Sequence, residues 1–318
     1  MKKIVVEKND AGQRLDKFMH KFFKSAMPTS MIYKSIRKKR IKINGKRGNE
    51  GDILQVGDVL EMYINDEFFE TEKTPVTKVK ADFDVVYEDE NIILIDKRAG
   101  IVVHDDDNGT VNTLVNQLYS YLIDKGEYNP DNENSFVPSL CNRIDRNTSG
   151  IVICAKTATA LRVLNQKMKD RELHKLYLCV VHGKMEKKTD TLEGYLVKDE
   201  KKNKVFISET NKNGGKFIRT KYTVLGYSDG LSLLEIDLLT GRTHQIRAHM
   251  AYLGMPVLGD SKYGDNNLNR QLKLKYQLLC SCYLKLGYIE DERYSYLSFK
   301  EFSCPDPWFV ESFKNRKL

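Results

Sequence analysis

Residues 238–249 read LLTGRTHQIRAH, and within this run a strand pattern changes into a helical one. Residues 231–239 are rich in apolar side chains, as in a buried strand, whereas 243–253 suit a helix that ends at Gly254. Five polar side chains gather at the change: Arg242, His244, Gln245, Arg247 and His249. A helix start rich in Arg and His suits phosphate binding or an ion pair with a carboxylate, and the ordinary alternative is a basic solvated face.

The helix predicted at 243–253 has an apolar stripe of three residues, Ile246, Met250 and Leu253. Helical spacing then places Arg247 on a different face from this stripe. The two histidines, His244 and His249, are five residues apart, not the four that place two metal ligands on one helix face. We therefore predict no metal site in this segment.

A second polar run, NRIDRNTSG at 142–150, stands directly before an apolar strand predicted at 151–155. A carboxylate at the mouth of a strand can be held rigidly and still face a cleft. The cations of Arg143 and Arg146 favour the ionised form of Asp145, which a nucleophile requires. Taken alone, however, an Asp between arginines is more often a solvated loop residue.

A third segment, KLYLCVVHG at 175–183, predicts a strand in which Tyr177 alternates with apolar residues. Most such tyrosines lie in a core, where the hydroxyl finds a partner. At a cleft, a tyrosine can also transfer protons or stack against a base. Sequence position does not choose between these readings.

The sequence contains no phosphate-binding P-loop, dinucleotide fingerprint or serine-hydrolase elbow. Its six cysteines form only one close pair, Cys280 and Cys282, in a C-x-C spacing that differs from zinc and redox motifs. We expect reduced thiols without metal or disulfide. Nothing therefore indicates ATP, a dinucleotide or a serine nucleophile.

The remaining patterns predict an α+β protein with two domains and a linker. Residues 1–65 contain two helical patterns and the hairpin-turn dipeptide Asn44-Gly45, which together suit a small α+β domain. Residues 66–82 are charged and weakly patterned, and we interpret them as a linker. Residues 83–318 predict a mixed, mostly antiparallel sheet with flanking helices, interrupted by an exposed loop at 124–135.

The bulk composition fits a globular protein, and its excess of positive charge is modest. The chain has 318 residues, 41% of them hydrophobic, and a formal net charge of +8. No run of 18 apolar residues is present, so we expect no membrane span. The charged N-terminus does not resemble a signal peptide, so we expect a cytoplasmic protein, with a monomer as the default state.

The three polar segments, in this order, resemble the RluA-type family of pseudouridine synthases. That family has a motif of the form His-Arg-Leu-Asp-x-x-Thr-Ser/Gly-Gly, which corresponds to 142–150 here, with Asn142 for the usual His and Ile144 for Leu. Its later motif, Leu-x-Thr-Gly-Arg-x-His-Gln-Ile-Arg-x-His, corresponds to 238–249, and the following Leu-Gly-x-Pro stretch corresponds to 253–260. Residues 1–65 resemble the small ribosomal-protein-like RNA-binding domain that many members carry.

The resemblance implies a reaction and roles. Asp145 takes the position of the family's essential aspartate, Tyr177 that of its active-site tyrosine, and Arg247 that of the arginine that pairs with the aspartate. The reaction detaches uracil from ribose, turns it and rejoins it through ring carbon 5. Because it involves no net redox change and no hydrolysis, it needs no cofactor. The target uridine must leave its stack to reach such a site.

The predicted partner is RNA, with 23S ribosomal RNA as the favoured target and transfer RNA as the alternative. Phosphate contacts are expected from basic residues in both domains. The predicted RNA-binding residues are Arg14, Lys17, Lys34, Arg37, Lys38, Lys39, Arg40, Lys46, Arg143, Arg146, Arg242, His244 and Gln245. Two rival readings stay open: a catalytically silent RNA-binding assembly factor, and a glycoside or nucleoside hydrolase, which would need a second carboxylate.

Overall fold

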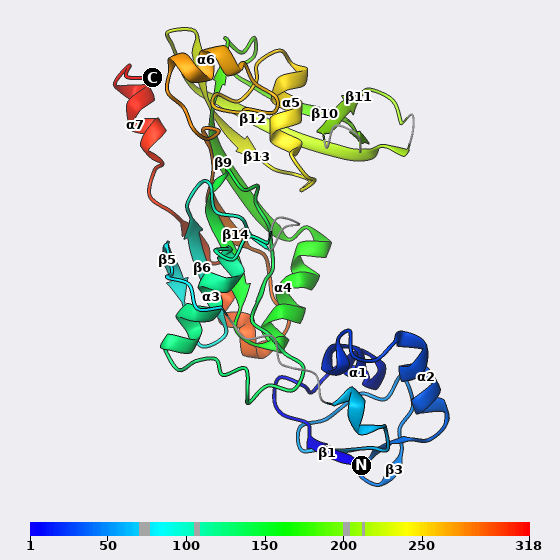
Figure 1. Cartoon of the computed structure of the whole chain (residues 1–318). Helices are drawn as coiled ribbons and strands as arrows, with labels where there is room; N and C mark the ends of the chain where they lie inside the picture. The colour runs from blue at the N-terminus through cyan, green and yellow to red at the C-terminus, as the bar shows by residue number, and fades with distance from the viewer. Residues whose placement is uncertain (70–76, 105–108, 200–203, 212–213) are drawn as a thin grey trace. The chain divides into compact units, whose positions relative to one another are not determined.

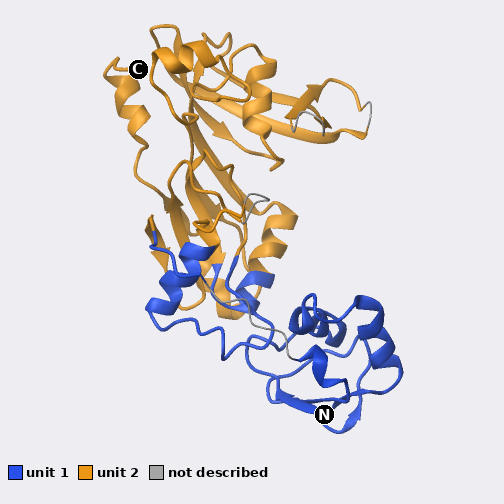
Figure 2. Ribbon diagram, viewed as in Figure 1, with its two compact units in different colours: residues 1–81, 116–139, 155–162 blue, residues 82–115, 140–154, 163–318 orange. Residues whose placement is uncertain are grey.

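The computed structural model describes residues 1–69, 77–104, 109–199, 204–211 and 214–318. The chain divides into two compact units (Figure 2). The first unit comprises residues 1–81, 116–139 and 155–162, and the second comprises 82–115, 140–154 and 163–318. Part of the predicted linker, 70–76, lies outside the described residues, and the domain boundaries at 65 and 83 stay a prediction.

The first unit contains, among its described residues, a four-stranded sheet in the order β1-β4-β2-β3 (Figure 1). Helical spacing buries Phe18 and Met19 of α1 and Ile32 and Ile36 of α2 in one apolar core with the sheet residue Leu60. This is the small α+β fold that the sequence predicted. Its elements are β1 (Lys2–Val5), α1 (Leu15–Phe23), α2 (Thr29–Arg37), β2 (Ile41–Ile43), β3 (Lys46–Arg47), β4 (Val59–Met62) and η1 (Asp66–Phe68).

The hairpin predicted at Asn44-Gly45 is confirmed. Both residues have positive φ, 51° and 76°, and Ile43 pairs with Lys46 across the two-residue turn. A turn with positive φ at both central positions matches the twist of the strands that flank it, and Asn and Gly tolerate that conformation best. The turn therefore sets the register of β2 and β3.

The segment predicted as an exposed loop at 124–135 is partly buried and belongs to the first unit. Tyr128 is buried within it. The Asp10 carboxylate accepts hydrogen bonds from Ser135 Oγ at 2.6 Å and from Asn134 Nδ2 at 2.8 Å. Polar composition predicted solvent exposure here, but the polar side chains are used to hold the N-terminal segment.

The larger sheet has 11 strands among the described residues, most of them paired antiparallel, with β8 and β14 paired in parallel (Figure 1). The predicted fold class, a mixed and mostly antiparallel sheet with helices, is confirmed. The main path runs β11-β10-β12-β13-β9-β14-β8-β6-β5. Its strands are β5 (Phe83–Glu88), β6 (Ile92–Lys97), β7 (Ser139–Leu140), β8 (Ser149–Ala155), β9 (Leu173–His182), β10 (Thr189–Asp199), β11 (Lys204–Ser208), β12 (Lys216–Ser228), β13 (Leu231–Asp237), β14 (Leu279–Leu286) and β15 (Glu301–Ser303).

The helix predicted at 243–253 is confirmed, and both of its ends lie within two residues of the predicted bounds. The helices are α3 (Leu114–Asp124), α4 (Ala158–Asp170), α5 (Gln245–Tyr252), α6 (Asn266–Gln271), η3 (Glu292–Leu297) and α7 (Trp308–Lys314). Among the described residues, none of these helices has the length and apolar character needed to cross a membrane. Helix α5 packs on the β10–β12 part of the sheet, where Ala248 forms one apolar cluster with Leu196, Val205 and Ile218.

Candidate active site

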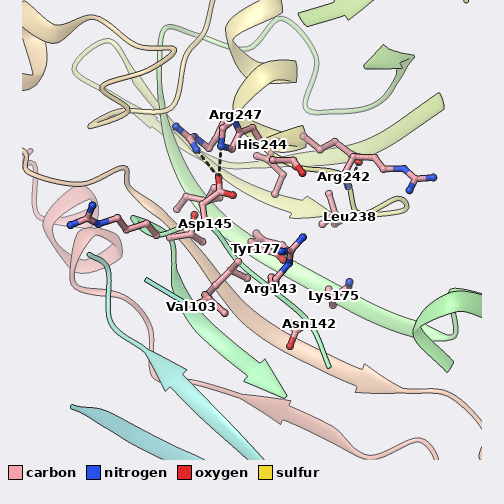
Figure 3. A pocket seen from close by; sticks show the side chains of 18 of the residues that line it. Val103, Asn142, Arg143, Asp145, Lys175, Tyr177, Leu238, Arg242, His244 and Arg247 are labelled. Atoms are coloured by element: carbon pink, nitrogen blue, oxygen red, sulfur yellow. Dashed lines mark hydrogen bonds and ion pairs between the residues drawn. The ribbon is translucent and has the colours of Figure 1, made fainter. Parts of the chain in front are cut away.

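A pocket of about 680 Å³ in the second unit is lined by residues from all three predicted polar segments (Figure 3). Its volume lies within the range of ligand sites. Asp145 comes from the loop before β8, Tyr177 from β9 and Arg247 from α5. The structure thus brings the three predicted catalytic residues to one cavity.

The loop that carries Asp145 is fixed to the sheet on both sides. Asn142 is buried, and its Oδ1 accepts a hydrogen bond from the backbone N of Ile153 at 2.7 Å. On the other side, Thr148 Oγ1 accepts from Gln277 Nε2 at 2.6 Å. Asn142 therefore serves as an anchor for the loop, which accounts for its place at the start of the motif.

Gly150 permits the close approach of β8 and β14 below this loop. Its φ is +107°, and a Cβ at this position would lie 2.2 Å from the backbone O of Ser281. Any larger residue would separate the two strands or strain the backbone. The Gly that ends the 142–150 run is thus required by packing beneath the pocket.

Lys97 is a buried lysine that sequence reasoning missed. Its Nζ donates to three backbone oxygens, those of Arg98 at 2.9 Å, Ile101 at 3.1 Å and Arg146 at 2.9 Å. Burial lowers its pKa to about 7, while the nearby charges of Asp145 and Asp96 act to raise it. Lys97 therefore ties the residue next to Asp145 to the end of β6.

Arg247 joins two carboxylates. Its Nε and Nη2 donate to Asp260 at 2.7 and 2.9 Å, and its Nη1 donates to Asp145 Oδ2 at 2.6 Å (Figure 3). Burial opposes the charge of Arg247, but its bonds and charge pairing with Asp260 and Asp145 outweigh burial and raise its pKa. For Asp260, burial acts to raise the pKa, yet the bonds from Arg247 prevail and lower it.

Helix α5 differs from the predicted stripe. Residues 245–250 are all buried, including Ile246 and Met250 of the predicted stripe, whereas Leu253 is 36% exposed. Arg247 and His249 are thus enclosed together with the apolar residues. Periodicity does not show this burial of Arg247, because it depends on the carboxylates of Asp145 and Asp260, which lie outside the helix.

Tyr177 is buried on β9, where it pairs in register with Ser281 of β14. Burial raises the pKa of its phenol to about 12, although a hydrogen bond with the Ser281 side chain acts in the opposite direction. The phenol is therefore protonated at neutral pH, and its ring forms part of the pocket wall.

Comparison with known proteins shows the family to which the chain belongs. Residues 91–252 match the family model described as RNA pseudouridylate synthase. An RNA pseudouridine synthase of Mycoplasma capricolum is 34% identical over 275 residues, which cover 85% of this chain and 88% of that protein. The chain belongs to the RNA pseudouridylate synthase family. It is accordingly an isomerase that acts on RNA.

Two further matches agree with this membership. Ribosomal large subunit pseudouridine synthase C of Escherichia coli K12 is 30% identical over 276 residues, covering 86% of this chain and 82% of that protein. The solved structure of human RNA pseudouridylate synthase domain containing 1 has a TM-score of 0.57 at 23% identity, and covers 75% of this chain and 87% of that one. The structural match shows that the synthase fold is shared.

The pocket of this synthase carries more positive than negative charge. Arg143 and Arg242 are exposed at its lining, and Arg146 is exposed beside Asp145. Lys175 also lines it, and burial lowers the pKa of its amine. No ion pair with Lys175 occurs in the part of the chain that the structure describes. Sequence reasoning missed Lys175, whose only signal was its position two residues before Tyr177 on one strand face.

Gln245 is buried, and intramolecular hydrogen bonds occupy its amide. Its Nε2 donates to Thr220 Oγ1 at 2.9 Å and to the backbone O of Arg219 at 3.0 Å. Its Oε1 accepts from Thr240 Oγ1 at 2.9 Å and from the backbone N of Arg242 at 3.1 Å. Gln245 thus ties the start of α5 to β12, and we do not retain it among the proposed RNA contacts.

Nine other RNA-binding residues were predicted. His244 lines the pocket, and the remaining eight lie in the first unit and are exposed. Arg37 to Arg40 follow one another at the end of α2, and Lys46 stands in the β2–β3 hairpin. The Arg14 guanidinium is engaged with Asp16 through bonds of 2.8 and 3.1 Å. We refer to residues 37–40 as the basic strip.

Proposed function

We propose that Asp145 is the nucleophile with which this synthase converts uridine to pseudouridine. The observation that carries the proposal is the geometry of its carboxylate. Oδ2 is held by Arg247 at 2.6 Å, while Oδ1 has no hydrogen bond with any described residue, and Asp145 lines the pocket. A carboxylate oriented through one oxygen and open at the other is suited to attack a substrate atom.

The proposed steps conserve atoms and electrons. Asp145 Oδ1 forms a bond to ribose C1′ as the bond from C1′ to N1 breaks and its electron pair leaves with uracil. The uracil turns, and its C5 attacks C1′ while the ester oxygen departs as carboxylate. C5 then loses its proton and N1 gains one, which completes the isomer.

The ion pairs suit a group that changes charge during these steps. Arg247 stabilises the carboxylate before attack and again when it leaves, and Asp260 holds the guanidinium in place. Tyr177 enters as a neutral phenol, so we assign it to the wall that packs against the uracil ring. Lys175, Arg143 and Arg242 supply positive charge for the phosphates that flank the target nucleotide.

For the substrate, we propose a uridine in 23S ribosomal RNA, with transfer RNA as the alternative. Relatives named ribosomal large subunit pseudouridine synthase C and D are 30% and 33% identical to the chain. Mapping of pseudouridines in cellular RNA from strains with and without the gene tests this choice. A site lost only from transfer RNA would replace the ribosomal target.

The test of the nucleophile compares the full-length protein with Asp145→Asn on total RNA from a strain that lacks the gene. Asn keeps the shape but lacks the negative charge, so we expect pseudouridine formation to fall at least about a thousandfold. RNA binding should change little. Asp291→Asn, at an exposed pair with Arg293, is the matched control and should retain full activity.

Three results would contradict this proposal in different ways. Equal activity of Asp145→Asn and wild type would exclude Asp145 as the nucleophile. Absence of product from both proteins on every RNA class would favour the silent assembly factor. Release of free uracil would revive the hydrolase reading, for which Asp260 is poorly suited because Arg247 occupies both of its oxygens.

A further inference from the structure

His244 stands between the candidate nucleophile and a tyrosine outside the predicted site. Its Nδ1 lies 2.9 Å from the hydroxyl of Tyr263, and its Nε2 lies 4.0 Å from Asp145 Oδ2. The latter distance is too long for a hydrogen bond. The imidazole therefore reaches into the pocket beside Asp145 with Nε2 leading (Figure 3).

The hydrogen-bond network assigns the tautomer of His244. The backbone N of Val205 donates to the Tyr263 hydroxyl oxygen at 3.0 Å. A phenol has one hydrogen, and donation to His244 Nδ1 is the arrangement that gives this hydrogen a partner. Nδ1 is then an acceptor, so the ring proton of the neutral imidazole sits on Nε2 and points toward the pocket.

The surroundings keep this imidazole neutral. Burial lowers the pKa of His244, and the positive charges of Arg247 and Lys262 act in the same direction, against the carboxylates of Asp145 and Asp260. A neutral ring does not form an ion pair with Asp145. The Nε2 hydrogen is accordingly available to a substrate atom.

The backbone conformation indicates that the position of His244 is imposed by its surroundings. Its φ is 54°, in the left-handed region, directly before α5. Such a conformation is unfavourable for a residue with a Cβ and persists where packing holds it. The edge-on contact with the Tyr263 ring, at 5.6 Å and 77°, supplies part of that packing.

We propose that His244 donates a hydrogen bond from Nε2 to an oxygen beside the glycosidic bond of the target nucleotide, and that Tyr263 is its positioning residue. This inference rests on the proposed attack of Asp145 at C1′. The candidate acceptors are the ribose 2′-hydroxyl and uracil O2, which flank the glycosidic bond. The ring oxygen O4′ is a poor acceptor, because it gives electron density to C1′ as that bond breaks. Either contact would help to orient C1′ for attack.

The functional test uses an RNA oligonucleotide around the mapped target, prepared with uridine, 2′-deoxyuridine or 2-thiouridine at that position. Single-turnover rates are measured for wild type, His244→Ala and His244→Gln. On the uridine RNA, His244→Ala should slow the reaction at least about tenfold. His244→Gln, which keeps an N–H donor, should recover part of the rate.

The three substrates distinguish the acceptors. If His244 donates to the 2′-hydroxyl, the His244→Ala penalty should shrink to less than about threefold on the 2′-deoxy RNA. If it donates to O2, the penalty should shrink on the 2-thio RNA. An equal penalty on all three RNAs would overturn the inference while wild-type activity still supports the proposed function.

The tautomer is tested directly by ¹⁵N NMR of histidine-labelled full-length protein at pH 7.5. We expect the neutral Nε2–H form for His244 in wild type and a mixture of tautomers in Tyr263→Phe. Tyr252→Phe, at an exposed tyrosine bonded to Glu209, is the matched control and should leave the His244 signals unchanged. A protonated ring or an Nδ1–H form in wild type would refute the assignment.

Discussion

Arg247 has two carboxylate partners, and their unequal burial separates their roles. Asp260 is completely buried and bonds to the guanidinium through both oxygens, whereas Asp145 is partly exposed and bonds through one. Backbone N–H groups of Lys262 and Tyr263 add hydrogen bonds to Asp260. Asp260 therefore fixes Arg247, and Arg247 in turn orients Asp145.

Because Asp260 fixes Arg247 and Arg247 orients Asp145, we can predict the effect of Asp260→Asn. The substitution leaves a buried guanidinium facing an amide, so we expect a loss of stability of about 3 kcal/mol and a fall in single-turnover rate of at least about tenfold. Chemical denaturation and rate measurements on the same RNA check both effects. The affinity of this variant for RNA should change by a smaller factor than its single-turnover rate.

The matched control for Asp260→Asn is Asp291→Asn. Asp291 bonds to Arg293 through both oxygens, at 2.6 and 2.9 Å, but the pair lies at the surface. Exposed pairs contribute about 0–1 kcal/mol, so this variant should be nearly as stable and active as wild type. Similar losses in both variants would mean that the buried pair has no special role.

Residues 245–250 of helix α5 are all buried, and the histidine among them, His249, has an effect on stability. His249 is buried, with Nδ1 2.8 Å from Thr220 Oγ1 and no hydrogen-bond partner at Nε2 among the described residues. Burial lowers its pKa to about 4. Between about pH 6.5 and pH 4, His249 is therefore protonated in the unfolded chain and neutral in the folded chain.

Above pH 6.5 His249 is neutral in both states, and its contribution to the free energy of unfolding is fully present. That contribution is lost as the pH falls from 6.5 through 4. We predict that His249→Asn reduces the fall in unfolding free energy between pH 7.5 and pH 4.5 by about 2–3 kcal/mol. Denaturation midpoints at the two pH values measure this difference. His182→Asn replaces an exposed histidine and should leave the pH dependence unchanged; a matching effect there would count against burial as the cause.

At the scale of the whole molecule, the question is which surface supplies affinity for RNA. The basic strip, residues 37–40, is exposed and follows α2 directly. Deletion of 1–65 would remove the contacts that Asp10 makes with Asn134 and Ser135 in the same unit. Charge neutralisation in the full chain is therefore the cleaner experiment.

We predict that changing all four strip residues to Gln lowers the slope of log affinity against log salt by up to about 3, because each phosphate contact contributes about 0.7–0.9. Filter binding to total ribosomal RNA over a range of salt concentrations measures the slope. The control neutralises four exposed cations of the second unit, Lys188, Lys314, Arg316 and Lys317. An equal change in the control would assign the effect to net charge.

The sequence by itself determined the fold class and the turn at Asn44-Gly45, and its resemblance to the RluA-type motifs supplied the candidate residues Asp145, Tyr177 and Arg247. The fold class and the turn depend on local signals: a period of 2 or 3.6 in apolar residues and the φ preference of Asn and Gly. Such signals are complete within about ten residues, so no distant partner is needed to read them.

Only the tertiary structure decided which polar side chains are buried and what they do there. Arg247 reaches Asp145 across 102 residues of sequence, and Thr148 reaches Gln277 across 129. Lys97, Asp260 and Tyr263 likewise gain their roles from partners in other elements. A buried charge is stable only beside its counter-charge or hydrogen-bond partners, and the fold brings those together, which is why the local pattern did not show that Arg247 is buried.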